Sequence, residues 1–354
     1  MIISYSNAKL FRQCQRQWYF KAKLAHWRAN DPLRREAYIL SKLQTLWAWR
    51  GQLVDQIISQ KIITAINHHR PVSLENILCK ARKLFDLQID FASRHGIREP
   101  GISKKLAGDA FAAWHALEYG ELINNADIEA AWQDIEQALQ NFFAMADLWD
   151  LLHASAKLIV QRSLQFNSFG FTVKATPDLI AFFNNDPPLI IDWKVHTFGF
   201  SDYRHQLALY ALALASVNPH SDFPIELPSI EPTQVRLLEI QLLAGQQRSY
   251  HLSESDIAAV EDFIAVIADE MHLAGGSLPV EELNVTDFAT AYSPDQCQRC
   301  PFRKLCWNPS DEMSNNQYFP NYQPGFIVGS VSALQATWPP QGSARVLSEP
   351  PTTV

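Results

Sequence analysis

The spacing of apolar residues changes twice along this chain, and no other feature restricts its fold as strongly. Over residues 10–69 and 74–151, apolar side chains recur every three or four positions, which is typical of amphipathic helices. Between residues 157 and 195 the pattern shortens to brief runs rich in β-branched and aromatic residues. These runs predict strands at residues 158–164, 169–175 and 189–191. The chain therefore begins as a helical region and continues into a sheet.

Helical spacing returns after the predicted strands. Residues 202–216 predict a helix, residues 235–243 predict another buried strand, and Ser253 is expected to cap a helix that ends near Gly275 and Gly276. This alternation of strand and helix predicts an α/β fold. With 354 residues, 47% of them apolar, the chain can bury such a core. The last 46 residues contain seven prolines and no sustained periodicity, so we expect a loosely ordered tail.

Charge is distributed unevenly along the chain. The formal net charge is -7, yet the first fifty residues contain ten lysines and arginines against two acidic residues. Residues 251–290 contain nine acidic residues and no lysine or arginine, and a basic cluster returns at Arg299, Arg303 and Lys304. A basic face on an acidic protein can bind phosphates, because the local field governs association. The alternative is that these are ordinary charged side chains on the solvent-exposed faces of helices.

Two aspartates and a lysine follow the predicted strands. Pro177 and Asp178 come after one strand, and Asp192 and Lys194 end the next. If these strands form a hairpin, Asp178 and Asp192 come close enough to share Mg²⁺, which prefers oxygen ligands. Lys194 lies two positions beyond Asp192, so both side chains point to the same face, where the lysine could orient a water and neutralise a phosphate oxygen. This predicts phosphodiester hydrolysis; the alternative is that the acids only form turns at strand ends.

The next predicted helix carries a polar pair, Gln206 and Tyr210. Positions four apart share one face of a helix, so both side chains could line the same site. The alternative is an ordinary amphipathic helix with two polar-tipped side chains.

These residues, in this order and spacing, resemble the PD-(D/E)XK nuclease superfamily, and in particular its RecB-like branch. The residues that carry the resemblance are Pro177, Asp178, Asp192, Lys194, Gln206 and Tyr210. The resemblance implies a restriction-endonuclease-like core, in which helices flank a mixed central sheet. It implies that the aspartates bind Mg²⁺ or Mn²⁺, that the lysine assists the attacking water, and that the glutamine and tyrosine contact DNA near the scissile phosphate.

The resemblance departs from the family at one position. An upstream helix in this family usually supplies a metal-binding histidine four residues after a glycine, whereas this chain has Gly51 followed by Asp55. A carboxylate oxygen can bind the same ion, so Asp55 is a third candidate ligand. The change also favours an altered metal preference or a loss of activity.

Three of the five cysteines form a compact motif, Cys297-x₂-Cys300-x₅-Cys306, whose spacing allows one shared metal centre. Cys14 is the best candidate for a fourth ligand, because Cys79 lies in an apolar helical stripe and is expected to be a small buried side chain. Four thiolates suit Zn²⁺ and a [4Fe–4S] cluster equally well. Such a site would clasp the two ends of the chain together.

The cysteine pattern resembles the iron–sulfur nucleases of the same superfamily, namely the AddB-type recombination subunits and the CRISPR-associated adaptation nucleases. This resemblance favours [4Fe–4S] over zinc. The two resemblances, taken with the periodicity and composition described above, lead us to expect five segments: residues 1–20 contributing to the cluster, a helical region at 21–155, the nuclease core at 156–290, the C-terminal cysteine motif at 291–308 and the tail at 309–354.

We therefore predict a metal-dependent deoxyribonuclease that acts in DNA repair, recombination or defence. Single-stranded DNA or a duplex end is the preferred substrate, because the basic N-terminal segment could form a channel wall. Trp18 and Trp27 could stack bases there, although helix core is the favoured interpretation. The chain has no helicase motif, so unwinding would require a helicase or another partner protein. The alternatives are a non-catalytic DNA-binding or scaffolding subunit and a zinc-stapled protein-interaction module.

We expect a cytoplasmic protein without membrane contact. Five scattered cysteines are too few for a secreted disulfide framework, and the N-terminal residues lack the pattern of a signal peptide. No run of eighteen apolar residues is free of charge.

Overall fold

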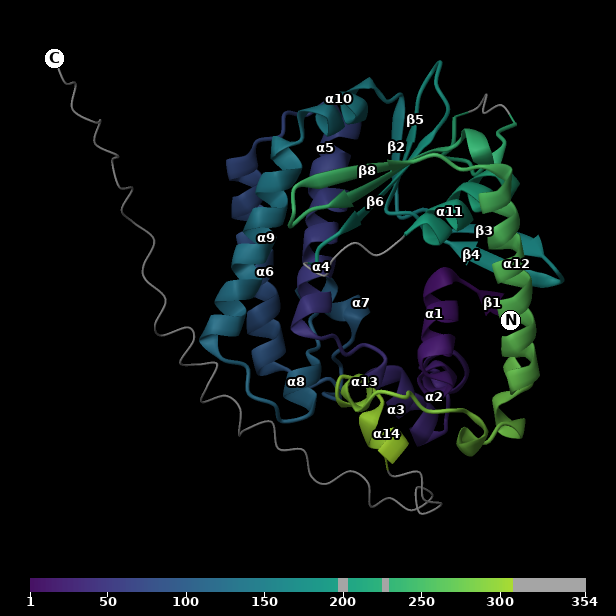
Figure 1. Ribbon diagram of the computed structural model, residues 1–354. Helices are drawn as coiled ribbons and strands as arrows, with labels where there is room; N and C mark the ends of the chain where they lie inside the picture. Colours follow the sequence, from purple (N-terminus) through teal and green to yellow (C-terminus); the bar gives the residue numbers. More distant parts are fainter. Residues whose placement is uncertain (197–202, 225–228, 308–354) are drawn as a thin grey trace.

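A mixed five-stranded sheet forms the centre of the computed structural model, which describes residues 1–196, 203–224 and 229–307 (Figure 1). Its strands, in spatial order, are β2 (Lys157–Val160), β5 (Leu179–Phe182), β6 (Leu189–Lys194), β7 (Arg236–Gln241) and β8 (Gln246–Tyr250). Strands β6 and β7 pair in parallel, and the other neighbours pair antiparallel. The predicted mixed sheet is thus confirmed. The predicted tail at 309–354 lies outside the described residues.

A second, three-stranded sheet has the order β1-β4-β3. It consists of β1 (Ile2–Ile3), β4 (Phe171–Ala175) and β3 (Leu164–Ser168), with β1 parallel to β4 and β3 antiparallel to it. The N-terminal residues therefore join a sheet whose other strands lie more than 160 residues further along the chain.

Helices cover both faces of the central sheet. The described helices are α1 (Tyr5–Gln13), α2 (Gln15–Trp18), α3 (Pro32–Leu40), α4 (Leu46–Ile57), α5 (Thr64–Asn67), α6 (Leu74–Arg94), α7 (Lys104–Ala107), α8 (His115–Glu118), α9 (Asn125–Ala144), α10 (Ala146–Ala154), α11 (Arg204–Ser216), α12 (Glu254–Met271), α13 (Pro294–Gln298) and α14 (Arg303–Trp307). None of those described is long and apolar enough to span a bilayer.

Three hydrophobic clusters hold these layers together. The first joins α4, α6 and α9 to one face of the sheet, through residues such as Ile57, Leu139 and Ile191. The second packs α11 and α12 against the other face (Figure 1). The third joins α1 and α2 to the end of α12 and to the C-terminal cysteine motif. Burial of this apolar surface, at about 25 cal/mol per Å², is the main force that fixes the layers.

Local sequence signals explain where the helices begin and end. Asn124 and Asp127 form a reciprocal capping box at the start of α9, and Ser253 and Asp256 form another at the start of α12. The chain leaves α12 through a π-helical turn, where Gly275 adopts a left-handed φ of 82°. The helix expected after Ser253 is thus confirmed, and α11 confirms the helix expected over 202–216 from Arg204 onward.

The predicted strand at 158–164 is wrong as a single strand. Strand β2 ends at Val160 and β3 begins at Leu164, and the two belong to different sheets. Gln161 lies between them with a left-handed φ of 47°, which turns the chain out of the first sheet. The strands β1, β5 and β8 were not predicted; β8 in particular carries too many polar residues to show an apolar pattern.

The basic N-terminal segment packs against the acidic C-terminal one. Arg12 pairs with Glu270 at 3.2 Å, Arg34 pairs with Glu281 at 3.1 Å, and Lys23 Nζ donates to the carbonyl of Gly276 at 2.9 Å. Part of the local positive charge is therefore neutralised within the protein, which leaves less of it for a DNA channel.

The two tryptophans of the basic segment differ in their surroundings. Trp18 is buried against Phe11, so its expected place in the core is confirmed. The same expectation is wrong for Trp27, which is 57% exposed and has the Arg28 guanidinium 4.3 Å from the centroid of its ring.

Candidate active site

The hairpin of β5 and β6 brings the two predicted aspartates together. In its register Leu179 pairs with Ile191, so that Asp178 and Asp192 stand opposite one another at the next position. Asp178 Oδ2 accepts a hydrogen bond from the backbone N–H of Trp193 at 3.0 Å. The strand that pairs is β5, which follows Asp178; the predicted 169–175 strand belongs to the other sheet. The predicted meeting of the two carboxylates nevertheless holds.

Burial raises the pKa of both carboxyl groups. Asp192 is almost completely buried, and Asp178 is partly exposed at its side chain. The pKa of Asp178 is raised well above its ordinary value by burial and then by the negative charge of Asp192. Burial also raises the pKa of Asp192, against the opposing effect of Lys194. Two desolvated carboxylates that repel each other are the arrangement that a divalent cation would stabilise.

Lys194 lies on the same face of β6 as Asp192 and forms an ion pair with its carboxylate. Burial lowers the pKa of Lys194, but the charges of Asp192 and Asp178 outweigh burial, so its pKa is raised. The ammonium group therefore stays charged in the site. The ring of Tyr203 lies 4.8 Å from Nζ and forms part of its surroundings.

Gln206 and Tyr210 project together from α11 toward the aspartates. Gln206 Nε2 donates to Tyr210 Oη at 2.6 Å and lies 3.4 Å from Asp192 Oδ1. Burial, followed by the charge of Asp192, raises the pKa of Tyr210, so its phenol remains protonated. The helix is buried on nearly all sides, which fixes the direction of both side chains.

Asp55 reaches the same site from α4, as the family pattern implied. Its Oδ1 accepts hydrogen bonds from the indole Nε1 of Trp193 at 3.0 Å and from Ser59 Oγ at 3.2 Å, and its Oδ2 accepts one from Gln161. Burial raises the pKa of Asp55, and these hydrogen bonds oppose the shift. Its carboxylate is thus oriented by three donors at the edge of the aspartate pair.

Three further residues complete this site, and sequence reasoning missed two of them, Gln161 and Glu239. Trp193 contacts two of the aspartates, Gln161 contacts Asp55, and Glu239 stands beside Asp192 in the β6–β7 register. Glu239 is buried and accepts a hydrogen bond from Tyr250 Oη at 2.5 Å. Its position, a single acid inside the apolar strand β7, was a sequence signal for a buried polar role. The roles of Trp193 and Gln161 depend on tertiary contacts and leave no such signal.

The four predicted cysteine ligands line one cavity. Cys14 lies between α1 and α2, and Cys297, Cys300 and Cys306 lie on or beside α13 and α14. Burial raises the pKa of the Cys300 thiol to about 12, and the charges of the other three cysteines add to this effect. Burial also raises the pKa of the Cys306 thiol. Arg16, whose Nη1 lies 3.9 Å from Cys306 Sγ, partly opposes that shift. Cys79, which was expected to be buried, is exposed on α6.

Protein contacts already join the two chain ends around these cysteines. Arg16 donates from its backbone N–H to the carbonyl of Ala289 at 3.0 Å and from Nε to that of Phe288 at 3.2 Å. The rings of Phe20 and Phe302 stack with centroids 5.5 Å apart. The two ends of the described chain are therefore joined by protein contacts alone; the expected metal clasp stays a prediction.

The donor atoms suit metals, although their arrangement does not form a closed cage. Within the described ranges, no group of three or more His, Cys, Asp or Glu side chains is arranged to hold a metal ion. Mg²⁺ does not require three, because it keeps several waters and is commonly held by one or two carboxylates and the substrate phosphate. The facing Asp178 and Asp192 fit that requirement. The four cysteines line one cavity, but within the described residues their thiols are not arranged as a metal centre.

A mixed sheet whose hairpin presents two acids and a lysine beneath a Gln–Tyr helix defines a class of nucleic-acid hydrolases. A family model of the PD-(D/E)XK nuclease superfamily matches residues 2–307, and the chain belongs to that superfamily. No curated protein matches the chain. Among solved structures, the crystal structure of SSO0001 aligns at 13% identity over 64% of this chain and 96% of the other, with a TM-score of 0.27.

Proposed function

We propose that this protein is a Mg²⁺- or Mn²⁺-dependent deoxyribonuclease of the RecB-like branch, which hydrolyses phosphodiester bonds. The single observation that supports this most is the convergence of Asp178, Asp192 and Lys194 on one face of the β5–β6 hairpin. Superfamily membership makes a nucleic acid the expected substrate. Asp178 and Asp192 would hold the cation, with Asp55 as a third ligand. Once bound, the cation would lower the pKa of a water and polarise the scissile phosphate.

The protein's own residues would position the reactants. Lys194 carries a positive charge next to Asp192, where it can donate to a water and neutralise a phosphate oxygen. The Gln206 amide and the protonated Tyr210 hydroxyl can hold the DNA strand over the hairpin. Trp193 fixes two of the carboxylates, because its backbone and indole N–H groups donate to Asp178 and Asp55.

A nuclease assay with two matched lysine variants tests this function. Full-length protein is incubated with labelled single- and double-stranded DNA in Mg²⁺ or Mn²⁺. We expect Lys194→Ala to abolish cleavage, and Lys174→Ala to retain it because Lys174 lies on β4 in the other sheet. Cleavage that survives in both Lys194→Ala and Asp192→Asn would contradict the proposal.

We also propose that Cys14, Cys297, Cys300 and Cys306 bind a [4Fe–4S] cluster with a structural role, with zinc as the alternative metal. The support is the shared cavity and the protein contacts around it. Anaerobic purification followed by absorption spectroscopy and metal analysis tests this. A brown protein with iron supports the cluster, and a colourless protein rich in zinc supports the alternative.

The proposed nuclease activity also suggests which form of DNA the protein acts on and with which kinds of proteins it works. Single-stranded DNA or DNA ends suit a nuclease core without a helicase motif, working with a helicase or other repair or defence proteins in the cytoplasm. The second candidate function is a non-catalytic DNA-binding subunit. It is favoured by Asp55, whose two oxygens are already occupied by three hydrogen-bond donors. Binding of DNA without cleavage, unchanged by Lys194→Ala, would identify it.

A further inference from the structure

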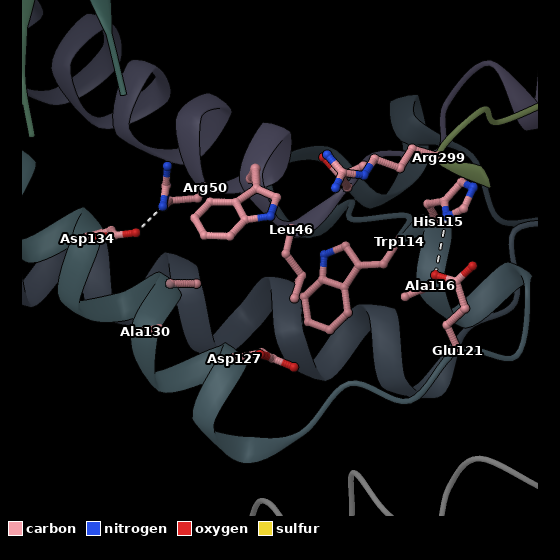
Figure 2. Close-up of a pocket in the computed structure, with 13 residues that line it drawn as sticks. Leu46, Arg50, Trp114, His115, Ala116, Glu121, Asp127, Ala130, Asp134 and Arg299 are labelled. Atoms are coloured by element: carbon pink, nitrogen blue, oxygen red, sulfur yellow. Dashed lines mark hydrogen bonds and ion pairs between the residues drawn. The ribbon is translucent and has the colours of Figure 1, made fainter. Parts of the chain in front are cut away.

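A second pocket lies between α4, α8, α9 and the cysteine motif, and none of the candidate catalytic residues lines it. Its volume is about 310 Å³, and its wall includes Trp47, Arg50, Trp114, His115, Asp127 and Arg299. Figure 2 shows Arg50 paired with Asp134 at one end and His115 paired with Glu121 at the other, with Trp114 and Arg299 between them. A pocket of this size with aromatic walls and a few polar groups is suited to a small planar ligand.

Trp47 provides an unusual surface in this pocket. It is 58% exposed, although a large aromatic side chain is normally buried. The Arg50 guanidinium lies 4.6 Å from the centroid of its ring, and Arg50 is itself only 1% exposed. The indole is therefore supported by a buried side chain while much of its own surface faces solvent. This is the form of a stacking platform.

The charges of the pocket favour an anionic group at one position. Asp134 is neutralised by Arg50, and Glu121 by Arg303 at 3.3 Å. The exposed guanidinium of Arg299 has no hydrogen-bonding or ion-pairing partner within the described ranges. On the opposite side, Asp127 retains acceptor capacity beyond its helix-capping bond to Asn124. An aromatic ring with hydrogen-bond donors and an attached phosphate complements this distribution.

We propose that this pocket holds one unstacked nucleotide of a DNA single strand, with its base on Trp47 and its phosphate at Arg299. This rests on the proposed function and specifies its substrate as single-stranded. Trp47 precedes Asp55 by eight residues on the same helix, which is about 12 Å along its axis. Arg50 also donates from Nη2 to the carbonyl of Val195 at 2.9 Å, directly after Lys194. The pocket wall is thus part of the scaffold that carries the candidate active site.

Binding is tested separately from cleavage. Full-length Lys194→Ala protein is titrated into fluorescently labelled oligo(dT), and anisotropy gives the affinity. We expect Trp47→Ala to weaken binding about ten-fold, which is about 1.4 kcal/mol, and Trp47→Phe to restore most of it. Arg299→Ala should weaken binding and reduce the slope of log K against log salt by about 0.7. Trp27→Ala is the matched comparison, because Trp27 has the same exposure and an arginine on its ring but lines none of the described pockets; we expect a smaller loss.

The proposal that this pocket binds a nucleotide is overturned by either of two results. In one, Trp47→Ala and Arg299→Ala both bind oligo(dT) as tightly as the parent; in the other, Trp27→Ala loses as much affinity as Trp47→Ala. Arg299 is exposed, so Arg299→Ala is expected to fold normally. It therefore still tests the pocket if Trp47→Ala proves too unstable to assay. A cleavage assay with Lys194 intact separates the pocket proposal from the proposed nuclease function. In Trp47→Ala the KM for single-stranded DNA should rise while kcat is retained. Absence of cleavage in the parent protein would instead contradict the nuclease function, whatever the binding result.

Discussion

At the scale of single residues, the candidate site concentrates negative charge where water is scarce. Asp178 and Asp192 face each other across the hairpin, Glu239 lies beside Asp192, and Lys194 is the nearby cation that compensates them. Burial raises the pKa of both aspartates. In the metal-free protein such a pair opposes folding, because the charged forms are less favourable in the folded state than in the unfolded chain.

The first prediction concerns Asp178→Asn. In the folded state the pKa of Asp178 is raised, so between the ordinary carboxyl pKa and the raised one the folded protein binds more protons than the unfolded chain. The stability of the metal-free parent should therefore fall as pH rises through that window. At neutral pH the metal-free Asp178→Asn protein should have an unfolding free energy about 1–2 kcal/mol higher than the parent, and therefore a higher melting temperature. It should no longer cleave DNA. Thermal melts between pH 4 and 8 check this, and a variant that melts lower than the parent at every pH contradicts it.

Much of the candidate site could be predicted from the sequence, because the arrangement of its residues depends on local periodicity. Period two places Lys194 beside Asp192, and period four places Gln206 beside Tyr210. The pairing strand was misplaced, since β5 has only four residues and no alternating pattern. The contact between Trp193 and Asp55 joins residues 138 apart, and no local pattern encodes it.

At the scale of elements, α4 connects the site to the helical layer. Arg50 is buried between α4 and α9, pairs with Asp134 and also holds the Val195 carbonyl at the end of β6. A buried charge is costly unless it is paired and hydrogen-bonded, and here both conditions are met by different elements. The ion pair therefore fixes α4 against α9, and the hydrogen bond to Val195 fixes α4, and with it Asp55, beside the strand that carries Asp192.

The second prediction is an asymmetry between the two partners. Asp134→Ala leaves the buried Arg50 without its counter-ion, whereas Arg50→Met leaves an aspartate that remains about one-third exposed. We expect Asp134→Ala to cost about 3–5 kcal/mol of unfolding free energy and Arg50→Met to cost less. Urea unfolding of both variants measures this. Arg94→Met, which removes the pair between a largely exposed Arg94 and Asp90 within α6, should change stability by at most about 0.5 kcal/mol. If Asp134→Ala and Arg50→Met lose the same unfolding free energy, the asymmetry is contradicted, and burial of the Arg50 charge does not determine the cost.

At the scale of the whole molecule, the N-terminal helices and the cysteine motif form one unit. Cys14, Arg16 and Phe20 contact residues 288–306, and Arg12 pairs with α12. The exposed ion pairs contribute little, typically below about 1 kcal/mol. The aromatic stacking and the burial of apolar side chains are therefore the main stabilising features of this junction. Net charge could not predict it, because the basic and acidic segments neutralise each other only once the chain has folded.

The third prediction compares two cysteine variants. Cys14→Ser should lower the melting temperature, the solubility and the bound iron or zinc, and reduce activity as well. Cys79→Ser is the control, because Cys79 is exposed and far from the cavity residues in sequence; it should behave as the parent. Melting curves and metal analysis of both proteins provide the measurement. A Cys14→Ser protein with full metal content and unchanged stability would show that Cys14 is not part of the clasp.

The junction between Cys14 and the C-terminal cysteines also sets an order of events during biosynthesis. Nearly 300 residues separate these partners, which a ribosome adds in about 15–60 s. Throughout that interval the aromatic side chains around Cys14 have none of their final C-terminal partners. The newly made N-terminal segment therefore keeps these side chains uncovered until residues 288–306 have been synthesised, and a metal held by all four cysteines could be loaded only after that.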